Sequence, residues 1–185
     1  MPATQLSSSR LILRSRQDTD LPAFADINAD PAVMELFPAP LTKNQSDALS
    51  HKLARELEER SWGYWAVECV NDKAFIGFVG ISPTHNAPGG EQIEIAWRLG
   101  RFSWGQGYAT EAALAVLKYA FTTLNLSNVI ALTALRNMRS RRVMERIGMC
   151  NTGENFAHPG LPADSSLSIH VLYKLSRTAY LESAD

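Results

Sequence analysis

The sequence predicts one α/β (α+β) domain, covering residues 1–185, in which helices flank a mixed central sheet. Segments with the continuous or alternating apolar character of strands are interleaved with segments whose apolar residues recur at helical spacing. Their order is strand, helices, three strands, helix, strand, helix, strand, which is typical of a mixed sheet. A chain of 185 residues fits one domain and is long enough to bury its own core.

The first half of the chain predicts one strand followed by helices. Residues 10–14 ("RLILR") are expected to form the strand, and residues 18–28 a helix. A short helix is expected over residues 30–38, because Asp30 is a favourable cap and Pro31 suits the first helical position. Thr42 and Gln45 have the spacing of a capping box. The apolar stripe of the helix that they open consists of Leu49, Leu53 and Leu57.

The second half of the chain predicts mainly strands. The expected strands cover residues 64–70, 74–81, 92–99, 129–135 and 168–175. The expected helices cover residues 108–124 and 140–147, and Gly148 stands where glycine commonly ends a helix. Residues 82–90 and 154–166 are expected to be loops because of their composition.

Composition and charge exclude several classes of function. The net charge is −1, so overall charge attracts the protein neither to nucleic acid nor to a membrane surface. Cys69 and Cys150 are too few and too far apart for a metal motif or a disulfide framework, so we expect two reduced thiols. We see no apolar leader and no run of about 20 apolar residues, and we therefore expect a cytoplasmic protein without a membrane span.

A glycine-rich segment joins the expected strand 92–99 to the expected helix 108–124. Gly105 and Gly107 permit positive φ and let another molecule touch the backbone. A helix start adds free N–H groups and a positive partial charge, so this corner suits a phosphate. The alternative is a tight turn that needs glycine and binds nothing.

Two familiar phosphate motifs do not fit this corner. Thr110 stands where the dinucleotide fingerprint needs a third small residue, and no acidic residue near Val129 ends a second strand. Lys118 comes too late for a P-loop. A nucleotide-dependent oxidoreductase is disfavoured for the same reasons.

A second strand-to-helix turn carries clustered arginines. Arg139, Arg141 and Arg142 lie at or just before the first turn of the expected helix 140–147. Cations there oppose the helix dipole and repel one another, and an anionic ligand would offset both effects. The alternative is a solvated basic turn. Two helix starts suited to anions, each after a strand, suggest one extended polyphosphate ligand.

These segments resemble the GCN5-related N-acetyltransferase (GNAT) superfamily, in particular its RimJ/RimL-like branch, which modifies protein N-termini and small amines. Residues 93–112, "IEIAWRLGRFSWGQGYATEA", look like the acyl-CoA motif, and residues 137–149, "NMRSRRVMERIGM", look like a later helix of the family. The combination is specific, whereas either segment alone is weak. "RLILR", "DPAVMELFP", "IGFVGI", "HPGLP" and "IHVLYKLSR" extend the resemblance over nearly the whole chain. Trp104 departs from the Gln or Arg that usually opens the motif.

The resemblance implies acetyl-CoA as the co-substrate and no metal. Backbone N–H groups of the glycine corner would bind the pyrophosphate. Exposed backbone groups of Trp97 and Leu99 would pair with the pantetheine arm, as an added strand does. Asn137 would contact the arm as well, and Arg141 and Arg142 would reach the adenosine phosphates. The residues expected to bind acetyl-CoA are Trp97, Leu99, Trp104, Gly105, Gln106, Gly107, Tyr108, Ala109, Thr110, Asn137, Ser140, Arg141 and Arg142.

Glu94 is the best candidate for the general base that deprotonates the amine. It interrupts an apolar strand just before the glycine corner, where burial would raise the pKa of its carboxyl. It also matches the carboxylate that many members of the family place on this strand. The alternative is an ordinary glutamate on the polar face of a strand. The weaker candidates are His158, His170, His85 and Glu35.

The general acid is harder to find. Many relatives carry a tyrosine four residues before the helix-ending glycine, where this chain has Met144. Ser140 is the substitute candidate for the acid, although serine is also a common helix cap. A CoA thiolate can also leave without an acid, since a thiol pKa is about 8.5.

The sequence and the resemblance together predict an acetyl-CoA-dependent N-acetyltransferase. The expected acceptor is a primary amine, either a protein or peptide N-terminus or a small amine. The alternative is a non-catalytic CoA-binding or regulatory module, which Met144 favours. No nucleic acid or membrane partner is expected, and a late strand offers an edge through which two copies could form a homodimer.

Overall fold

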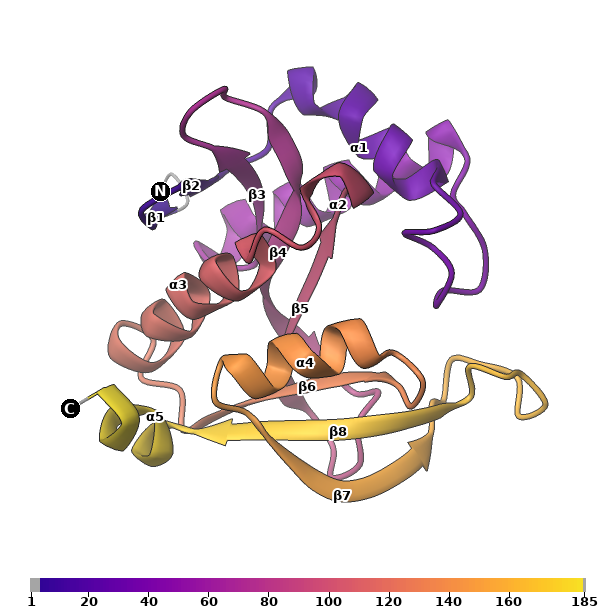
Figure 1. Cartoon of the computed structure of the whole chain (residues 1–185), viewed down its shortest axis with the longest axis vertical. Coiled ribbons are helices and arrows are strands. Elements are labelled where there is room, and N and C mark those ends of the chain that lie inside the picture. The colour runs from indigo at the N-terminus through magenta and orange to yellow at the C-terminus, as the bar shows by residue number, and fades with distance from the viewer. Residues whose placement is uncertain (1–3, 185) are drawn as a thin grey trace. The chain divides into compact units, whose positions relative to one another are not determined.

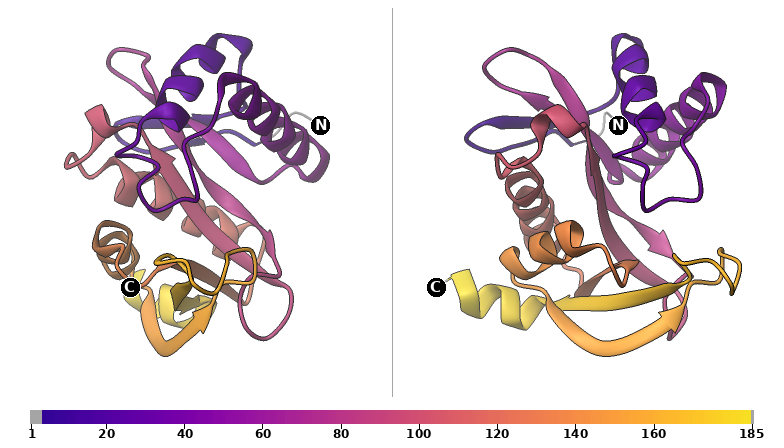
Figure 2. Two further views of the ribbon diagram at one scale, coloured as in Figure 1. Left: turned by 90° about the vertical axis from the view of Figure 1, so that its right-hand side faces the viewer. Right: turned by 45° about the vertical axis from the view of Figure 1, so that its right-hand side comes forward.

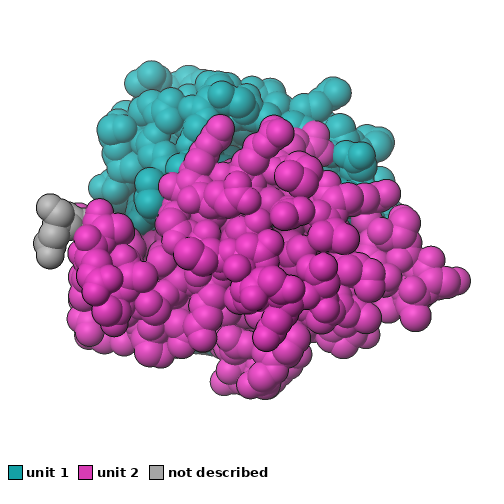
Figure 3. Space-filling model, turned by 60° about the horizontal axis from the view of Figure 1, so that its bottom comes forward, with its two compact units in different colours: residues 1–81, 97–116 teal, residues 82–96, 117–185 magenta. Residues whose placement is uncertain are grey.

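The computed structural model describes residues 4–184. The chain divides into two compact units (Figure 3). Unit 1 consists of residues up to 81 together with residues 97–116, and unit 2 consists of residues 82–96 together with those from 117 onward. A single domain over residues 1–185 stays a prediction.

Within residues 4–184, eight strands form a mixed sheet with the order β1-β2-β3-β4-β5-β6-β8-β7. β5 and β6 run parallel, whereas the β1–β2, β2–β3, β3–β4, β6–β8 and β7–β8 pairs are antiparallel. The strands are β1 (Leu6–Ser7), β2 (Leu11–Arg14), β3 (Tyr64–Cys69), β4 (Phe75–Thr84), β5 (Gln92–Leu99), β6 (Asn128–Ala134), β7 (Cys150–Ala157) and β8 (Ile169–Ser176). The helices are α1 (Leu21–Ala29), α2 (Lys43–Arg60), α3 (Tyr108–Thr122), α4 (Met138–Arg146) and α5 (Arg177–Ala184). The predicted α/β class with a mixed sheet and flanking helices is confirmed.

In unit 1, α1 and α2 lie side by side and cover one face of the strands β3 and β4 (Figure 1). Phe24 of α1 and Leu53 of α2 pack with Phe78 of β4 in one apolar cluster. The predicted capping box starts α2 as expected: the Thr42 hydroxyl accepts from the Gln45 N–H at 3.3 Å, and the Gln45 side chain accepts from the Thr42 N–H at 2.9 Å. The sequence therefore specifies both the start of this helix and the face that it buries.

In unit 2, β7 and β8 form a long hairpin that is joined to β6 through β8 (Figure 2). Ile130 of β6 and Leu172 of β8 pack with Ala87 in a second apolar cluster. α4 contacts both β6 and β7, and α5 packs against β8. These contacts fix the position of α4 against β6 and β7, and its first residue, Met138, follows shortly after the end of β6.

The structure differs from the sequence-based expectation at several places: β1 and α5 were not predicted, and three predicted segments have a different conformation or different bounds. The predicted helix over 30–38 is wrong, because these residues form turns. Too few residues lie between Pro31 and Pro38 to repay the cost of starting a helix. β4 continues to Thr84 into the expected loop, and the expected loop 154–166 begins inside β7. β7 gave no strand signal because its residues are polar and largely exposed, and its pairing with β8 holds it in place.

Candidate active site

The glycine corner between β5 and α3 is open toward solvent. Gly105 has φ 75° and Gly107 has φ 82°, a backbone conformation that residues with a side chain rarely adopt. A Cβ placed at Gly105 would meet no atom within 4 Å, and one at Gly107 would meet only Arg10 Nη2 at 3.5 Å. The glycines are therefore needed for the turn, and the space beside their backbone can admit a ligand.

α3 begins directly after the corner. The Glu111 N–H donates to the Gly107 carbonyl at 3.0 Å, so this is the first bond of the helix. The N–H groups of Tyr108, Ala109 and Thr110 therefore belong to the first turn, which lacks intrahelical partners for its N–H groups. A helix start of this kind suits an anion.

Glu111 ties the N-terminal segment to this corner. Its Oε1 accepts from the Ser8 hydroxyl at 2.7 Å and from the Arg10 N–H at 2.9 Å. Its Oε2 lies 2.7 Å from Arg10 Nε and 2.6 Å from Arg10 Nη2. Arg10 Nη1 in turn donates to the Gln106 carbonyl at 3.1 Å, so Arg10 links the acid to the loop itself.

The surroundings of Glu111 favour its charged form. Burial alone would raise the pKa of Glu111, but hydrogen bonds from Ser8, Arg10 and Ser9 outweigh burial and lower it. Glu111 thus stays ionised at neutral pH and holds the positive charge of Arg10. Arg10 and Glu111 were not among the predicted site residues. The signal was present, since the acid lies in the motif and Ser8, Ser9 and Arg10 stand at the start of the first predicted strand.

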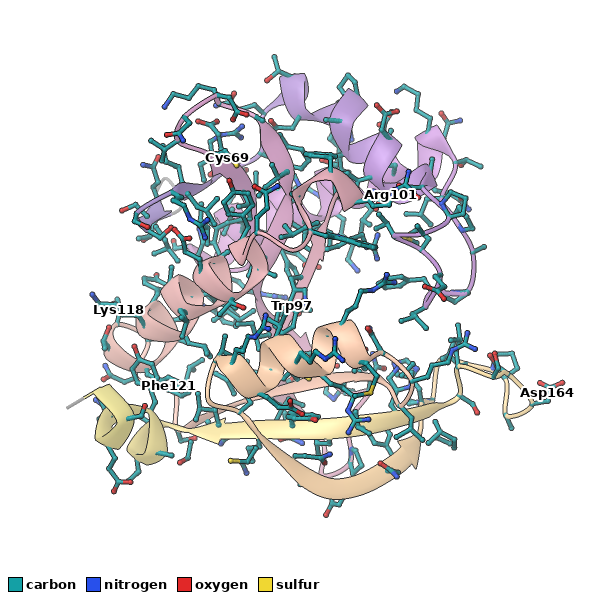
Figure 4. All side chains as sticks on the ribbon, in the orientation of Figure 1. Cys69, Trp97, Arg101, Lys118, Phe121 and Asp164 are labelled. Carbon is teal, nitrogen blue, oxygen red and sulfur yellow. The ribbon has the colours of Figure 1, made fainter. Side chains whose placement is uncertain are left out.

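The end of β5 leads into the corner within unit 1. The Trp104 indole N–H donates to the Leu99 carbonyl at 2.9 Å, and the Gly100 N–H donates to the Ile76 carbonyl at 2.9 Å. The tryptophan that departs from the family motif therefore closes the turn after β5. One lone pair of the Leu99 carbonyl is taken by this bond. Figure 4 marks Trp97 on β5 and Arg101 in the turn that follows.

Glu94 lies on the part of β5 that belongs to unit 2, in register with Ile130 of the parallel strand β6. Its side chain is half-buried. Burial raises the pKa of Glu94 to about 7, and a hydrogen bond from the Thr84 hydroxyl opposes this rise. Thr84 is itself buried, and its hydroxyl also accepts from the Asn86 N–H at 3.2 Å. Thr84 was missed because residues 82–90 read as a loop.

The start of α4 is occupied by its own cap. The Asn137 Oδ1 accepts from the Ser140 N–H at 3.1 Å, and its Nδ2 donates to the Thr133 hydroxyl at 2.8 Å. The helix begins two residues earlier than expected, at Met138. Asn137 is therefore the cap, and the predicted alternative role of Ser140 as the cap is wrong.

The arginines at this helix start differ in their surroundings. Arg141 Nε donates to the Tyr173 hydroxyl at 3.3 Å and Arg141 Nη1 to the Leu135 carbonyl at 3.1 Å, whereas Arg142 is exposed. Met144 is 2% exposed and belongs to the core. Its side chain has no proton to donate, in line with the missing acid.

Of the weaker base candidates, His170 pairs with Ala134 at the end of β6. His158 and His170 pack ring against ring, with centroids 4.6 Å apart, and burial lowers the pKa of both. His85 is exposed and lies 3.2 Å from a Glu91 oxygen. Both cysteines are free, with Cys69 buried at the end of β3 (Figure 4).

Residues 4–184 contain no group of three or more His, Cys, Asp or Glu side chains that could hold a metal ion. No helix in the described part of the chain is long and apolar enough to cross a membrane. The predicted residues fall into two sets. Unit 1 brings together Trp97, Leu99 and the corner from Trp104 to Thr110, while Glu94 and the start of α4 belong to unit 2.

A mixed sheet with an open helix start after a glycine turn is the arrangement expected of an α/β protein that takes a phosphorylated ligand. The protein family described as "Acetyltransferase (GNAT) domain" matches residues 10–150. The chain therefore belongs to the GNAT acetyltransferase family. Members of this family are transferases that move acyl groups other than aminoacyl groups, and they use acetyl-CoA.

Two known relatives are similar to most of this chain. The chain is 32% identical to the uncharacterized protein YkkB of Bacillus subtilis over 79% of this chain and 85% of that one. It is 29% identical to the uncharacterized N-acetyltransferase YnaD of the same organism over 80% and 84%.

Solved structures share the fold. The GNAT-family acetyltransferase of Bacillus anthracis has a TM-score of 0.80 at 24% identity, covering 95% of this chain and 99% of that one. Spermidine N-acetyltransferase of Vibrio cholerae, solved with CoA and spermine, has a TM-score of 0.72 at 20% identity, covering 94% and 99%.

Proposed function

We propose that the chain transfers the acetyl group of acetyl-CoA to a primary amine, either the N-terminal amine of a protein or peptide or the amine of a small molecule. The observation that carries this proposal is the glycine corner, where two left-handed glycines leave open space beside the backbone at a helix start. Membership of the GNAT family supports acetyl-CoA as the donor.

The donor is proposed to bind mainly through backbone groups. The N–H groups from Gly105 to Thr110 would take the pyrophosphate, as helix starts commonly take phosphates. Backbone groups of Trp97 and Leu99 would pair with the pantetheine arm. By resemblance to the family, contacts to the donor are also assigned to Asn137, Ser140, Arg141 and Arg142.

Glu94 is proposed to be the general base. The amine nitrogen attacks the thioester carbonyl carbon, the C–S bond breaks, and the amine proton passes to the carboxylate directly or through water. With a pKa of about 7, Glu94 is about half ionised at neutral pH and can accept a proton there. An N-terminal amine, with a pKa near 8, is itself partly neutral.

The CoA thiolate is proposed to take its proton from Ser140 or from solvent. The Ser140 side chain is half-buried in the first turn of α4. A thiol with a pKa near 8.5 is also a good leaving group at neutral pH without a dedicated acid. The proposal also includes membership of the RimJ/RimL-like branch, a single catalytic domain and a cytoplasmic location.

A release assay for the CoA thiol, run over a panel of primary amines, tests the proposal. We expect amine-dependent thiol release together with one acetylated product per thiol. A second candidate, a non-catalytic CoA-binding module, is favoured only by the buried Met144. Tight CoA binding without turnover on any amine would support that module instead.

A further inference from the structure

Unit 1 holds two guanidinium groups against one aromatic ring, and the proposed transfer step uses neither. Cζ of Arg16 lies 5.4 Å and Cζ of Arg98 lies 5.5 Å from the centroid of the Phe78 ring. Arg16 also lies 5.1 Å from the Phe24 ring centroid, and Arg98 lies 4.2 Å from that of Phe37. Both guanidinium groups thus contact the Phe78 ring, and each contacts a second phenyl ring as well.

Part of the hydrogen-bond donor capacity of these two groups is buried and not used by the protein. Arg16 Nη1 donates to the Tyr64 carbonyl at 3.0 Å, and Arg98 Nη1 donates to Asn28 Oδ1 at 2.6 Å. Arg16 Nε, Arg16 Nη2 and Arg98 Nε are buried and have no hydrogen-bond partner within residues 4–184. A buried donor normally has a partner, because leaving it unpaired costs free energy.

The neighbouring Arg14 shows what a structural arginine looks like in the same unit. Its Nη1 and Nη2 form a two-pronged pair with Asp20 at 2.8 and 2.9 Å, and its Nε lies 2.7 Å from Glu68. Asp20 is thereby taken, and neither Arg16 nor Arg98 forms an ion pair with a carboxylate of the described residues.

Burial lowers the pKa of Arg16 and of Arg98 to about 10, and both remain charged at neutral pH. Cation–π contacts with the phenyl rings do not supply the missing acceptors. If packing were the only role, a long apolar side chain would serve as well or better, since a buried charge without a partner opposes folding. An added carboxylate fits this setting, because its two oxygens accept hydrogen bonds from a guanidinium.

The position of Arg98 on β5 links this pair to the proposed reaction. Arg98 stands between Trp97 and Leu99, whose backbone groups are proposed to hold the pantetheine arm. Side chains alternate along a strand, so the Arg98 side chain lies on the face opposite to those of its two neighbours. That face is the one where it meets Asn28 of α1.

We propose that Arg98 and Arg16 bind a carboxylate of the amine acceptor, so that the acceptor is a primary amine that also carries a carboxylate. This inference rests on the proposed acetyl transfer. The carboxylate belongs either to a free amino acid or to the acidic first residue of a peptide, and the two sources present the same group to the arginines.

Thiol release from acetyl-CoA over matched pairs of amines tests this inference. One pair is L-alanine and L-alaninamide, and the second is the peptide Asp-Ala-amide and its counterpart Asn-Ala-amide. Each pair differs in a carboxylate against a carboxamide. The comparison of wild type with variant within each pair cancels the intrinsic reactivity of the amine.

We expect Arg98→Met to lower kcat/KM for the carboxylate member of the preferred pair by about 10- to 100-fold, as loss of a charge-assisted hydrogen bond would. The carboxamide member should change less than about threefold. The kcat/KM of Arg98→Lys for the carboxylate member should lie between those of wild type and Arg98→Met. Lysine keeps the positive charge but cannot donate two parallel hydrogen bonds to one carboxylate. Arg55→Met removes an exposed charge from α2 in the same unit and should leave both members unchanged.

Thermal unfolding separates this role from a structural one. We expect Arg98→Met and Arg16→Met to unfold close to the wild-type temperature, because each removes a buried charge with unpaired donors but also one hydrogen bond, to Asn28 Oδ1 or to the Tyr64 carbonyl. If both variants unfold earlier and lose activity equally on both members of each pair, the arginines are structural and the inference falls.

Two binding measurements keep this test distinct from that of the proposed function. Calorimetry with CoA reports the donor site alone, and absence of CoA binding overturns the proposed function together with this inference. If CoA binds but no amine reacts, binding of N-acetyl-L-alanine and of N-acetyl-L-alaninamide is compared by calorimetry in the presence of CoA. Carboxylate binding that Arg98→Met abolishes supports the inference, and equal or absent binding of the two compounds overturns it.

Discussion

The glycine corner before α3 and the start of α4 are both helix starts that follow a strand, and both were predicted to suit an anion. They differ in which groups lie next to the free backbone N–H groups of the first helical turn. At α4 the Asn137 side chain accepts from the Ser140 N–H, and the Arg141 guanidinium is bonded to the Tyr173 hydroxyl and the Leu135 carbonyl. At α3 the residue before the helix is Gly107, which has no side chain to act as a cap, and two glycines leave the space beside the backbone open.

The difference shows how a helix start becomes available for a ligand. An N-cap side chain occupies the position that a phosphate oxygen would take, whereas glycine leaves that position free. The positive charge at the corner is moreover paired: Arg10 is held by Glu111 and supports the loop through the Gln106 carbonyl. We therefore expect the backbone of the corner to contribute more to CoA binding than the side chains of α4.

Replacement of Gly107 by valine should produce the largest effect on CoA binding. The valine side chain would stand where the phosphate is proposed to bind, and we expect the Kd for CoA to rise on the order of 100-fold, about 2.7 kcal/mol. Isothermal titration calorimetry with CoA measures this Kd. Gly153→Val is the matched control, because Gly153 has φ 80° and open space around it but lies on the exposed strand β7.

Both glycine variants should share the cost of forcing a side chain into left-handed backbone, about 1–3 kcal/mol of stability. Only Gly107→Val should weaken CoA binding. Equal loss of CoA affinity in the two variants would mean that the effect is one of stability, and the proposed role of the corner would then be wrong.

Replacement of Glu94 by glutamine should lower turnover and leave CoA binding intact. We expect turnover at neutral pH to fall roughly 10²- to 10⁴-fold, the usual contribution of a general base, with CoA affinity unchanged. Wild-type turnover should rise with pH through about 7 as the Glu94 carboxylate forms, and this rise should be absent in the variant. Glu91→Gln, at an exposed position, is the control. An unaltered pH–rate profile in Glu94→Gln would remove Glu94 as the base.

The raised pKa of Glu94 also predicts a change in stability with pH. The folded state holds a proton that the unfolded state releases between the ordinary pKa of 4.5 and the folded value of about 7. The contribution of Glu94 to stability is therefore fully present below pH 4.5 and declines as the pH rises through about 7. Denaturant titrations at pH 5 and pH 8 should show Glu94→Gln gaining stability relative to wild type at the higher pH.

Loss of the Glu111 charge should have a smaller effect on binding. Glu111→Gln weakens the hold on Arg10, and we expect the KM for acetyl-CoA to rise about threefold to tenfold with kcat nearly unchanged. Steady-state kinetics measures the two constants separately. A fall in kcat at constant KM would instead place Glu111 in the chemical step.

Replacement of the α4 cap should affect stability more than binding. Asn137→Ala removes the bond from the Ser140 N–H and should cost about 1 kcal/mol of stability. Thermal unfolding measures that loss, and Asn137→Asp should recover part of it because aspartate also caps helices. A loss of CoA affinity larger than that of Gly107→Val would reverse the comparison between the two helix starts.

Local sequence patterns predicted much of this fold. The Thr42–Gln45 capping box, β5 over residues 92–99 and the end of α4 before Gly148 were confirmed, because each depends on neighbours along the chain. β7 could not be predicted, since its strand conformation comes from pairing with β8 across a loop. The turns over 30–38 show the reverse case, in which favourable end signals enclose too few residues for a helix.

The candidate site follows the same division. Gly105 and Gly107 were recognisable because positive φ selects glycine, and their conformation is confirmed. Thr84 beside Glu94 and the pair of Arg16 and Arg98 around Phe78 were not recognisable. These partners come from segments far apart along the chain, so no local spacing in the sequence predicts their contact.

The most direct test of the central claim is a titration of the ¹⁵N-labelled chain with CoA, followed through the backbone amide resonances. We predict that the amides from Gly105 to Thr110 shift most, and that pantetheine, which lacks the pyrophosphate, leaves them in place. If CoA binds while these amides stay unmoved and those of α4 shift instead, the glycine corner does not bind the pyrophosphate.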